Sequence, residues 1–111
     1  MLHALFICSR NRLRSPTAAQ VFATTDGVET DSAGLAVDAE CPISAEQLAW
    51  ADIVFVMEKV HRSKLSQRFG RNLVGKKVVC LDIPDNYDFM QPELVALLDR
   101  KVSPHLRIRP R

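Results

Sequence analysis

The sequence has few cysteines, and their spacing is not that of a disulfide-bonded or zinc-binding small domain. Its three cysteines, Cys8, Cys41 and Cys80, form no close pair and no Cys-x-x-Cys motif. This spacing argues against a disulfide framework and against a zinc knuckle. We therefore expect reduced thiols, a cytoplasmic location and no metal site.

The chain also lacks a long hydrophobic run and a strong excess of one charge. The apolar stretch 2–8 is short, no basic segment precedes it and arginines follow it directly, which argues against a signal peptide or a membrane span. The 15 basic side chains are nearly balanced by 13 acidic ones, and the net charge is +2. We therefore expect neither a membrane nor a nucleic acid as a partner.

Length and composition limit the number of domains. A chain of 111 residues with 47% apolar side chains can bury one modest core. We expect a single domain over residues 1–102. The segment 103–111 is basic and shows no periodic pattern, which predicts a poorly ordered tail.

Short apolar runs alternate with segments of helical spacing along the chain. Strands are expected at 2–8, 28–34, 51–57 and 76–83, and helices at 15–25, 45–50, 58–69 and 92–102. Near-continuous apolar runs are typical of strands that are buried on both faces. The alternation predicts an α/β fold in which helices flank a four-stranded parallel sheet and ligands bind beyond the carboxyl ends of the strands.

The stretch CSRNRLR, residues 8–14, lies between the first expected strand and a helix. Ser15 is the expected N-cap of this helix and Pro16 its first residue. Free N–H groups and the positive end of the helix dipole attract a tetrahedral anion at such a turn, with phosphate as the obvious occupant. The same amides and Arg14 would stabilise Cys8 as a nucleophilic thiolate. Arg14 can also grip two phosphoryl oxygens with its planar guanidinium.

A Cys-x5-Arg spacing alone is weak evidence, but three segments of this chain resemble one family. CSRNRLRSP (8–16) resembles the phosphate loop of low-molecular-weight protein tyrosine phosphatases, C-x-G-N-x-C-R-S-P. TDSAG (30–34) and FVMEKVHRSKL (55–65) are similar to the second-strand motif and the Met-Asp segment of that family. The resemblance extends from residue 2 to about residue 98.

The resemblance implies a fold and an activity. The fold would be the three-layer phosphotyrosine phosphatase I type, with four parallel strands in flavodoxin-like order. The activity would be cysteine-dependent hydrolysis of phosphomonoesters through a phosphocysteine intermediate, with phosphotyrosine as the leading substrate. The partners would be a phosphorylated protein or a small aryl phosphate, with inorganic phosphate as product and no cofactor.

The resemblance also assigns roles to residues. Cys8 would be the nucleophile and Arg14 the phosphate-binding cation. The family takes its general acid from an Asp-Pro-Tyr loop, whose nearest equivalent here is Asp85-Asn86-Tyr87. Asp85 is the preferred general acid, with Asp82 and Asp88 as alternatives. Tyr87 would stack against an aromatic leaving group.

The other residues of the loop complete the expected phosphate site. Asn11 tolerates a left-handed backbone and can hold the loop in shape, and by the resemblance Ser32 would hydrogen-bond to it. Ser15 can also donate a hydrogen bond to the thiolate. The residues expected to bind substrate are Ser9, Arg10, Asn11, Arg12, Leu13, Ser15 and Tyr87.

The sequence departs from the family pattern at several positions. Arg10 replaces a loop glycine, Leu13 replaces a second cysteine, and Glu58 follows Met57 where the family has aspartate. The segment 35–41 lacks the aromatic side chain that helps to line the substrate crevice of the family. These departures leave the choice of substrate open.

Two other functions fit parts of the pattern. An arsenate reductase of the same fold needs further thiols, and Cys41 and Cys80 are the only candidates. A phosphate-binding or phosphoprotein-binding module without catalysis is compatible with Arg10 in the loop. The three histidines, His3, His61 and His105, show no ligand spacing and are interpreted as surface or structural residues.

Overall fold

The computed structural model describes residues 1–106 of the chain. Its centre is one sheet of four parallel strands in the order β2-β1-β3-β4. The strands are β1 (Leu2–Cys8), β2 (Val28–Gly34), β3 (Ile53–Val56) and β4 (Lys77–Cys80). The expected four-stranded parallel sheet in flavodoxin-like order is confirmed.

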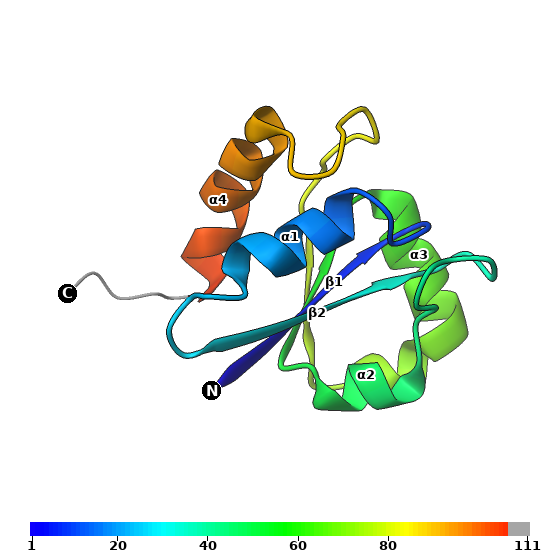
Figure 1. Cartoon of the computed structure of the whole chain (residues 1–111). Coiled ribbons are helices and arrows are strands. Elements are labelled where there is room, and N and C mark those ends of the chain that lie inside the picture. Colours follow the sequence, from blue (N-terminus) through cyan, green and yellow to red (C-terminus); the bar gives the residue numbers. More distant parts are fainter. Residues whose placement is uncertain (107–111) are drawn as a thin grey trace.

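Helices cover both faces of the sheet (Figure 1). They are α1 (Arg14–Phe22), α2 (Ala45–Trp50), α3 (Lys59–Phe69), the 3-10 helix η1 (Gly70–Leu73) and α4 (Pro92–Leu106). Helices α1 and α4 pack on one face, and α2 and α3 on the other. The result is the expected three-layer arrangement.

Strand β1 is buried on both faces, which explains its continuous apolar sequence. Phe6 packs with α1 and α4 and stacks on Phe55 of β3 with 5.1 Å between ring centroids. Leu5 and Ile7 belong to the core on the opposite face. Because side chains alternate along a strand, Cys8 shares the face of Phe6 and lies on the side of α1.

The register brings the carboxyl ends of the strands to one edge of the sheet. Cys8 pairs with Gly34 of β2, and Ile7 pairs with Val56 of β3, which in turn pairs with Cys80 of β4. The connections that follow β1, β2, β3 and β4 therefore meet at this edge, which is where ligands bind in sheets of this kind.

Several element boundaries differ from the expectation by a few residues. Helix α1 differs at both ends, and it ends at Phe22 rather than at residue 25. Helix α1 begins at Arg14, and Leu13 rather than Ser15 is its N-cap, because the backbone N–H of Thr17 already bonds the Leu13 carbonyl at 3.1 Å. Ser15 therefore lies inside the first turn, where its side chain cannot cap.

Helix α4 continues through Leu106, four residues beyond the expected end of the domain at Val102. Val102 and Leu106 are one turn apart and both are buried, so the apolar face of the helix extends further than expected. The first four residues of the expected tail are thus helical, and its remainder, 107–111, lies outside the described residues. Among residues 1–106 no helix is long and apolar enough to cross a membrane.

Candidate functional site

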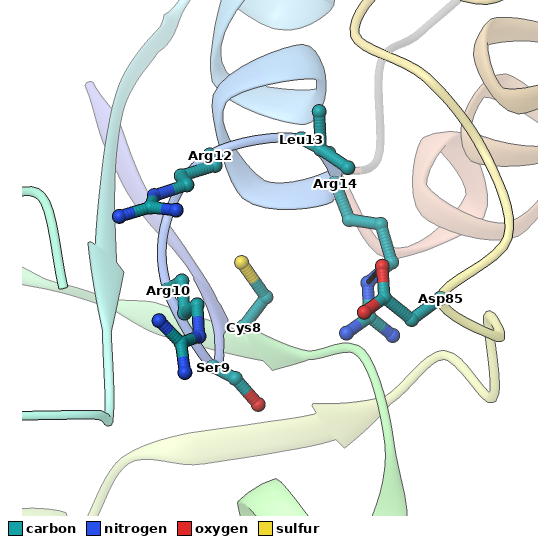
Figure 2. A pocket seen from close by; sticks show the side chains of 7 residues that line it. All are labelled: Cys8, Ser9, Arg10, Arg12, Leu13, Arg14 and Asp85. Carbon is teal, nitrogen blue, oxygen red and sulfur yellow. Dashed lines mark ion pairs between the residues drawn. The ribbon is translucent and has the colours of Figure 1, made fainter.

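A cavity of about 390 Å³ opens at the carboxyl edge of the sheet, between the loop after β1 and the segment after β4 (Figure 2). One lining residue comes from the segment after β4, and the others come from the predicted phosphate loop, residues 8–14. The lining residues are Cys8, Ser9, Arg10, Arg12, Leu13, Arg14 and Asp85. The structure therefore brings together the three residues predicted to be catalytic, although Asp85 is far from Cys8 and Arg14 in the sequence.

Cys8 lies at the centre of this loop with its sulfur turned into the cavity (Figure 2). The residue is only 4% exposed. The backbone N–H of Asn11 donates a hydrogen bond to the sulfur over 3.2 Å. The sulfur thus has a backbone N–H donor and lies next to the N-terminus of α1.

The segment after β2 determines which way the loop peptides face. The backbone N–H groups of Leu35, Ala36 and Glu40 donate to the carbonyls of Cys8, Ser9 and Arg10 at 2.8–3.1 Å. In a trans peptide the carbonyl and the following N–H point in opposite directions. Fixing these carbonyls against the segment after β2 therefore turns the following N–H groups toward the cavity, where they can bind an anion.

Asn11 has a left-handed backbone with φ of 56°, a conformation that asparagine tolerates better than most residues. Its side-chain amide donates to the Glu40 carbonyl at 2.9 Å. The expected partner, Ser32, is not the one observed. The segment after β2 folds back over the loop and brings Glu40 to Asn11, while the Ser32 carbonyl accepts from Gln47 at 3.4 Å.

Arg14 is 3% exposed and its guanidinium is held from three sides. Its Nη1 donates to Glu58 Oε2 at 2.6 Å and to the Ile83 carbonyl at 2.7 Å. Its Nε lies 3.7 Å from Asp85 Oδ1 (Figure 2). A buried guanidinium is stable only with such partners. Glu58, the N-cap of α3, thus helps to keep a positive charge beside the cavity.

His61 supports the loop from behind. Its ring is 1% exposed, and its Nδ1 accepts from the Glu58 backbone N–H at 3.1 Å. The proton of the neutral ring is therefore on Nε2, which lies 2.9 Å from Ser9 Oγ and donates to it. Burial, and secondarily the charge of Arg14, lowers the pKa of His61 below its ordinary value of 6.5, which keeps the ring in this neutral form.

Glu58 and His61 were not among the residues predicted for the site. His61 was interpreted only as a surface or structural residue, and its burial agrees with the second of these alternatives. Glu58 is the N-cap of α3 and His61 is the third residue of the helix, and reciprocal capping contacts join them. Contacts at this spacing are local, so the sequence could have indicated them. Their contacts with Arg14 and Ser9 join segments 44 and 52 residues apart, and no local pattern indicates them.

Of the three candidate acids, only Asp85 lines the cavity. Asp82 has a φ of 52° and lies in a separate depression beside α3. The backbone N–H of Asp88 bonds Gln91 at 2.9 Å, at the turn that leads into α4. The side chain of Asp85 is also 64% exposed, so its carboxyl group can reach a molecule bound in the cavity.

Some predicted substrate-binding residues lie outside the cavity lining. Tyr87 packs against the core between the sheet and α4, so the structure does not place it for stacking on a leaving group. Ser15 is fully buried, and its hydroxyl has no hydrogen-bond partner in residues 1–106. The other two cysteines, Cys41 and Cys80, do not line the cavity either. Within residues 1–106 no group of three potential metal ligands is found.

The comparisons with known proteins agree with this geometry at the level of the fold. No family model and no curated protein matches the chain. Among solved structures, YwlE arginine phosphatase from Geobacillus stearothermophilus superposes with a TM-score of 0.76 at 23% identity, covering 96% of this chain and 94% of that one. The tyrosine phosphatase Wzb from Escherichia coli K30, in complex with phosphate, gives 0.73 at 19% identity, covering 95% and 96%.

A third structure, SP-PTP from Streptococcus pyogenes, is a low-molecular-weight protein tyrosine phosphatase. It superposes with a TM-score of 0.78 at 15% identity and covers 100% of this chain and 95% of its own. The chain therefore has the fold of low-molecular-weight protein tyrosine phosphatases over nearly its whole length, as the resemblance in the sequence predicts.

Proposed function

We propose that the protein is a cysteine-dependent phosphatase that hydrolyses phosphomonoesters, with phosphotyrosine as the leading substrate. The observation that carries this proposal is the position of Cys8. Its sulfur lies in the cavity, receives the Asn11 N–H at 3.2 Å and is ringed by a loop that leads into the N-terminus of α1. This is the environment that activates a thiolate and also binds a tetrahedral anion.

The chemistry proceeds in two displacements. In the first, the Cys8 thiolate attacks phosphorus, the bond from phosphorus to the leaving oxygen breaks, and Asp85 gives its proton to that oxygen. In the second, Asp85 takes a proton from water, the water oxygen attacks phosphorus, and the sulfur–phosphorus bond breaks. Inorganic phosphate leaves and the thiolate is restored.

The loop and Arg14 supply the electrostatic part of catalysis. The inward N–H groups and the guanidinium stabilise the charge on the phosphoryl oxygens during both displacements. Glu58 and the Ile83 carbonyl hold Arg14 in place before substrate arrives, so little reorganisation is needed during the reaction.

The two alternatives from the sequence have less support. Arsenate reduction requires a second thiol to form a disulfide with Cys8 and release the reduced product. Cys41 and Cys80 both lie outside the cavity lining. A module that only binds phosphate would have no use for a carboxyl group beside the mouth, yet Asp85 is placed there.

Hydrolysis of para-nitrophenyl phosphate tests the proposal. Cys8→Ser is expected to lower kcat to less than about one thousandth of the wild-type value, and Asp85→Asn to lower kcat/KM for a substrate with a poor leaving group by about 100-fold or more. Cys41→Ser, which changes an exposed thiol outside the cavity, is the matched control and should keep wild-type rates. Full activity of Cys8→Ser would overturn the proposal, and arsenate-dependent oxidation of the thiols would favour the reductase.

A further inference from the structure

We propose that Arg10 and Arg12 form a second anion-binding site at the mouth of the cavity, which selects phosphomonoesters whose leaving group carries an additional negative charge. This inference rests on the proposed function, because it concerns the substrate of the same site. Neither side chain is needed for the two displacements, yet both line the cavity.

The two arginines lie on one side of the cavity, and Arg14 and Asp85 lie on the other, with the sulfur of Cys8 between them (Figure 2). The side chains of Arg10 and Arg12 are 54% and 53% exposed, whereas Arg14 is 3% exposed. Arg14 is thus placed to bind the phosphoryl group, and the other two guanidinium groups to contact what is attached to it.

In-line attack determines where the leaving group lies. The leaving oxygen must be on the side of phosphorus opposite the Cys8 sulfur, which is the side that opens to solvent. Asp85 must reach this oxygen to protonate it. A leaving group therefore passes through the mouth between Asp85 and the side chains of Arg10 and Arg12.

The lining of the cavity offers few apolar side chains to a neutral aromatic leaving group. Among residues 1–106, Leu13 is the only one with an aliphatic or aromatic side chain in the lining, and Tyr87 packs against the core instead. A pocket for a neutral ring normally has apolar or aromatic walls. Two exposed guanidinium groups suit a carboxylate or a phosphate instead, which each can bind through two parallel hydrogen bonds.

Both arginines now pair with carboxylates that an incoming anion can replace. Arg10 Nη1 lies 2.9 Å from Asp38 Oδ2, and Arg12 Nε lies 3.9 Å from Glu40 Oε1. All four side chains are more than half exposed, so each pair contributes little stability. A guanidinium has five N–H donors, and each of these two ion pairs involves one nitrogen atom of the arginine, so donors also remain for a substrate anion.

The additional charge can come from two sources with the same chemistry. It can be an acidic side chain next to phosphotyrosine in a protein, or a carboxylate on a small aryl phosphate. Two matched pairs of substrates separate them. One pair is a phosphotyrosine peptide flanked by Glu and the same peptide flanked by Gln, and the other is 3-carboxyphenyl phosphate and 3-carbamoylphenyl phosphate.

The readout is the ratio of kcat/KM within each pair at low ionic strength. The wild type is expected to prefer the anionic member of at least one pair by about 3- to 10-fold, with the preference falling as salt is added. In the double variant Arg10→Gln, Arg12→Gln the ratio should fall to about one, whatever happens to the absolute rates. The double variant Asp38→Asn, Glu40→Gln should raise the ratio, because it removes the competing carboxylates.

Arg71→Gln is the matched control. Arg71 is exposed and lies in η1, which precedes β4, so it is near the amino ends of the strands and away from the cavity. It should leave the ratio unchanged. Calorimetric binding of 3-carboxybenzylphosphonate and its carboxamide analogue tests the same site without turnover, so a failure of catalysis is distinguishable from a failure of this inference. Equal affinities for the two phosphonates together with equal kcat/KM within both substrate pairs, or a preference that survives loss of both arginines, would overturn it.

Discussion

Ser9 and His61 show how a single buried ring can set the orientation of a loop. The Nε2 proton of His61 is donated to Ser9 Oγ, and Nδ1 accepts the N–H of Glu58. Protonation of His61 would place a second N–H against the Glu58 N–H and would add a buried positive charge near Arg14. The neutral ring is therefore the form compatible with the folded site.

The sign of the resulting pH dependence follows from the direction of the shift. The pKa of His61 is below 6.5 in the folded protein, mainly because the ring is desolvated. Below pH 6.5 the unfolded chain takes up a proton on this residue that the folded chain does not, so the free energy of unfolding should fall as pH decreases, until folded His61 is itself protonated. Well above pH 6.5 the ring is neutral in both the folded and the unfolded chain, so this loss of stability is absent.

Chemical denaturation at a series of pH values measures this effect. We expect His61→Gln to reduce the loss of stability below pH 6.5 relative to wild type, because glutamine does not titrate. An identical pH dependence in wild type and variant would show that His61 does not contribute in this way.

At the scale of elements, the carboxyl end of β2 is the support on which the phosphate loop rests. Gly34 is the last residue of β2, and a Cβ there would lie 2.4 Å from the Ala39 Cβ and 2.8 Å from the Ser9 carbonyl oxygen. The Ser9 carbonyl accepts a hydrogen bond from the backbone N–H of Ala36, in the segment after β2. Only glycine allows this approach of strand and loop.

Gly34→Ala should therefore displace the loop. We expect a loss of stability of about 1–3 kcal/mol from overpacking, with a fall in affinity for inorganic phosphate, measured by denaturation and by calorimetry. Gly70→Ala is the matched control, because a Cβ at Gly70 meets nothing within 4 Å and its φ is −50°. If Gly34→Ala and Gly70→Ala behaved alike, the support assigned to β2 would be wrong.

The elements were largely predictable because their signals are local. Buried parallel strands such as β1 and β3 are continuous apolar runs, and Ser44 caps α2 through a reciprocal contact with Gln47 that ordinary capping preferences predict. The predicted N-cap of α1 was wrong by two residues because Ser15, a residue type favoured at caps, is used inside the first turn. Burial in the first turn is a property of the packing, which no local pattern reports.

The candidate site was predictable only in part, for the same reason. Cys8 and Arg14 belong to one short segment, and Asp85 was found through a family resemblance. The contacts of Asn11 with Glu40 and of Arg14 with Glu58 depend on how distant segments fold back at the sheet edge. A sequence without a structure gives no signal for such pairs.

At the scale of the whole molecule, the parallel sheet brings the carboxyl ends of four strands to one edge, and the cavity is built there. The solved structures with the same fold include an arginine phosphatase and tyrosine phosphatases, so the fold does not determine the substrate. In this chain two of the side chains that differ from the family pattern, Arg10 and Leu13, line the cavity. The fold accounts for the position of the Cys8 sulfur, and we propose that the mouth determines the choice of substrate.

The most direct test of this account is to trap the covalent intermediate. Asp85→Asn slows the attack of water, whereas para-nitrophenolate leaves without needing a proton, so the variant should accumulate phosphoenzyme with para-nitrophenyl phosphate. Rapid quench in alkaline denaturant followed by peptide mass spectrometry is predicted to find one phosphoryl group on Cys8. Turnover without any adduct on Cys8, or an adduct on another residue, would contradict the account.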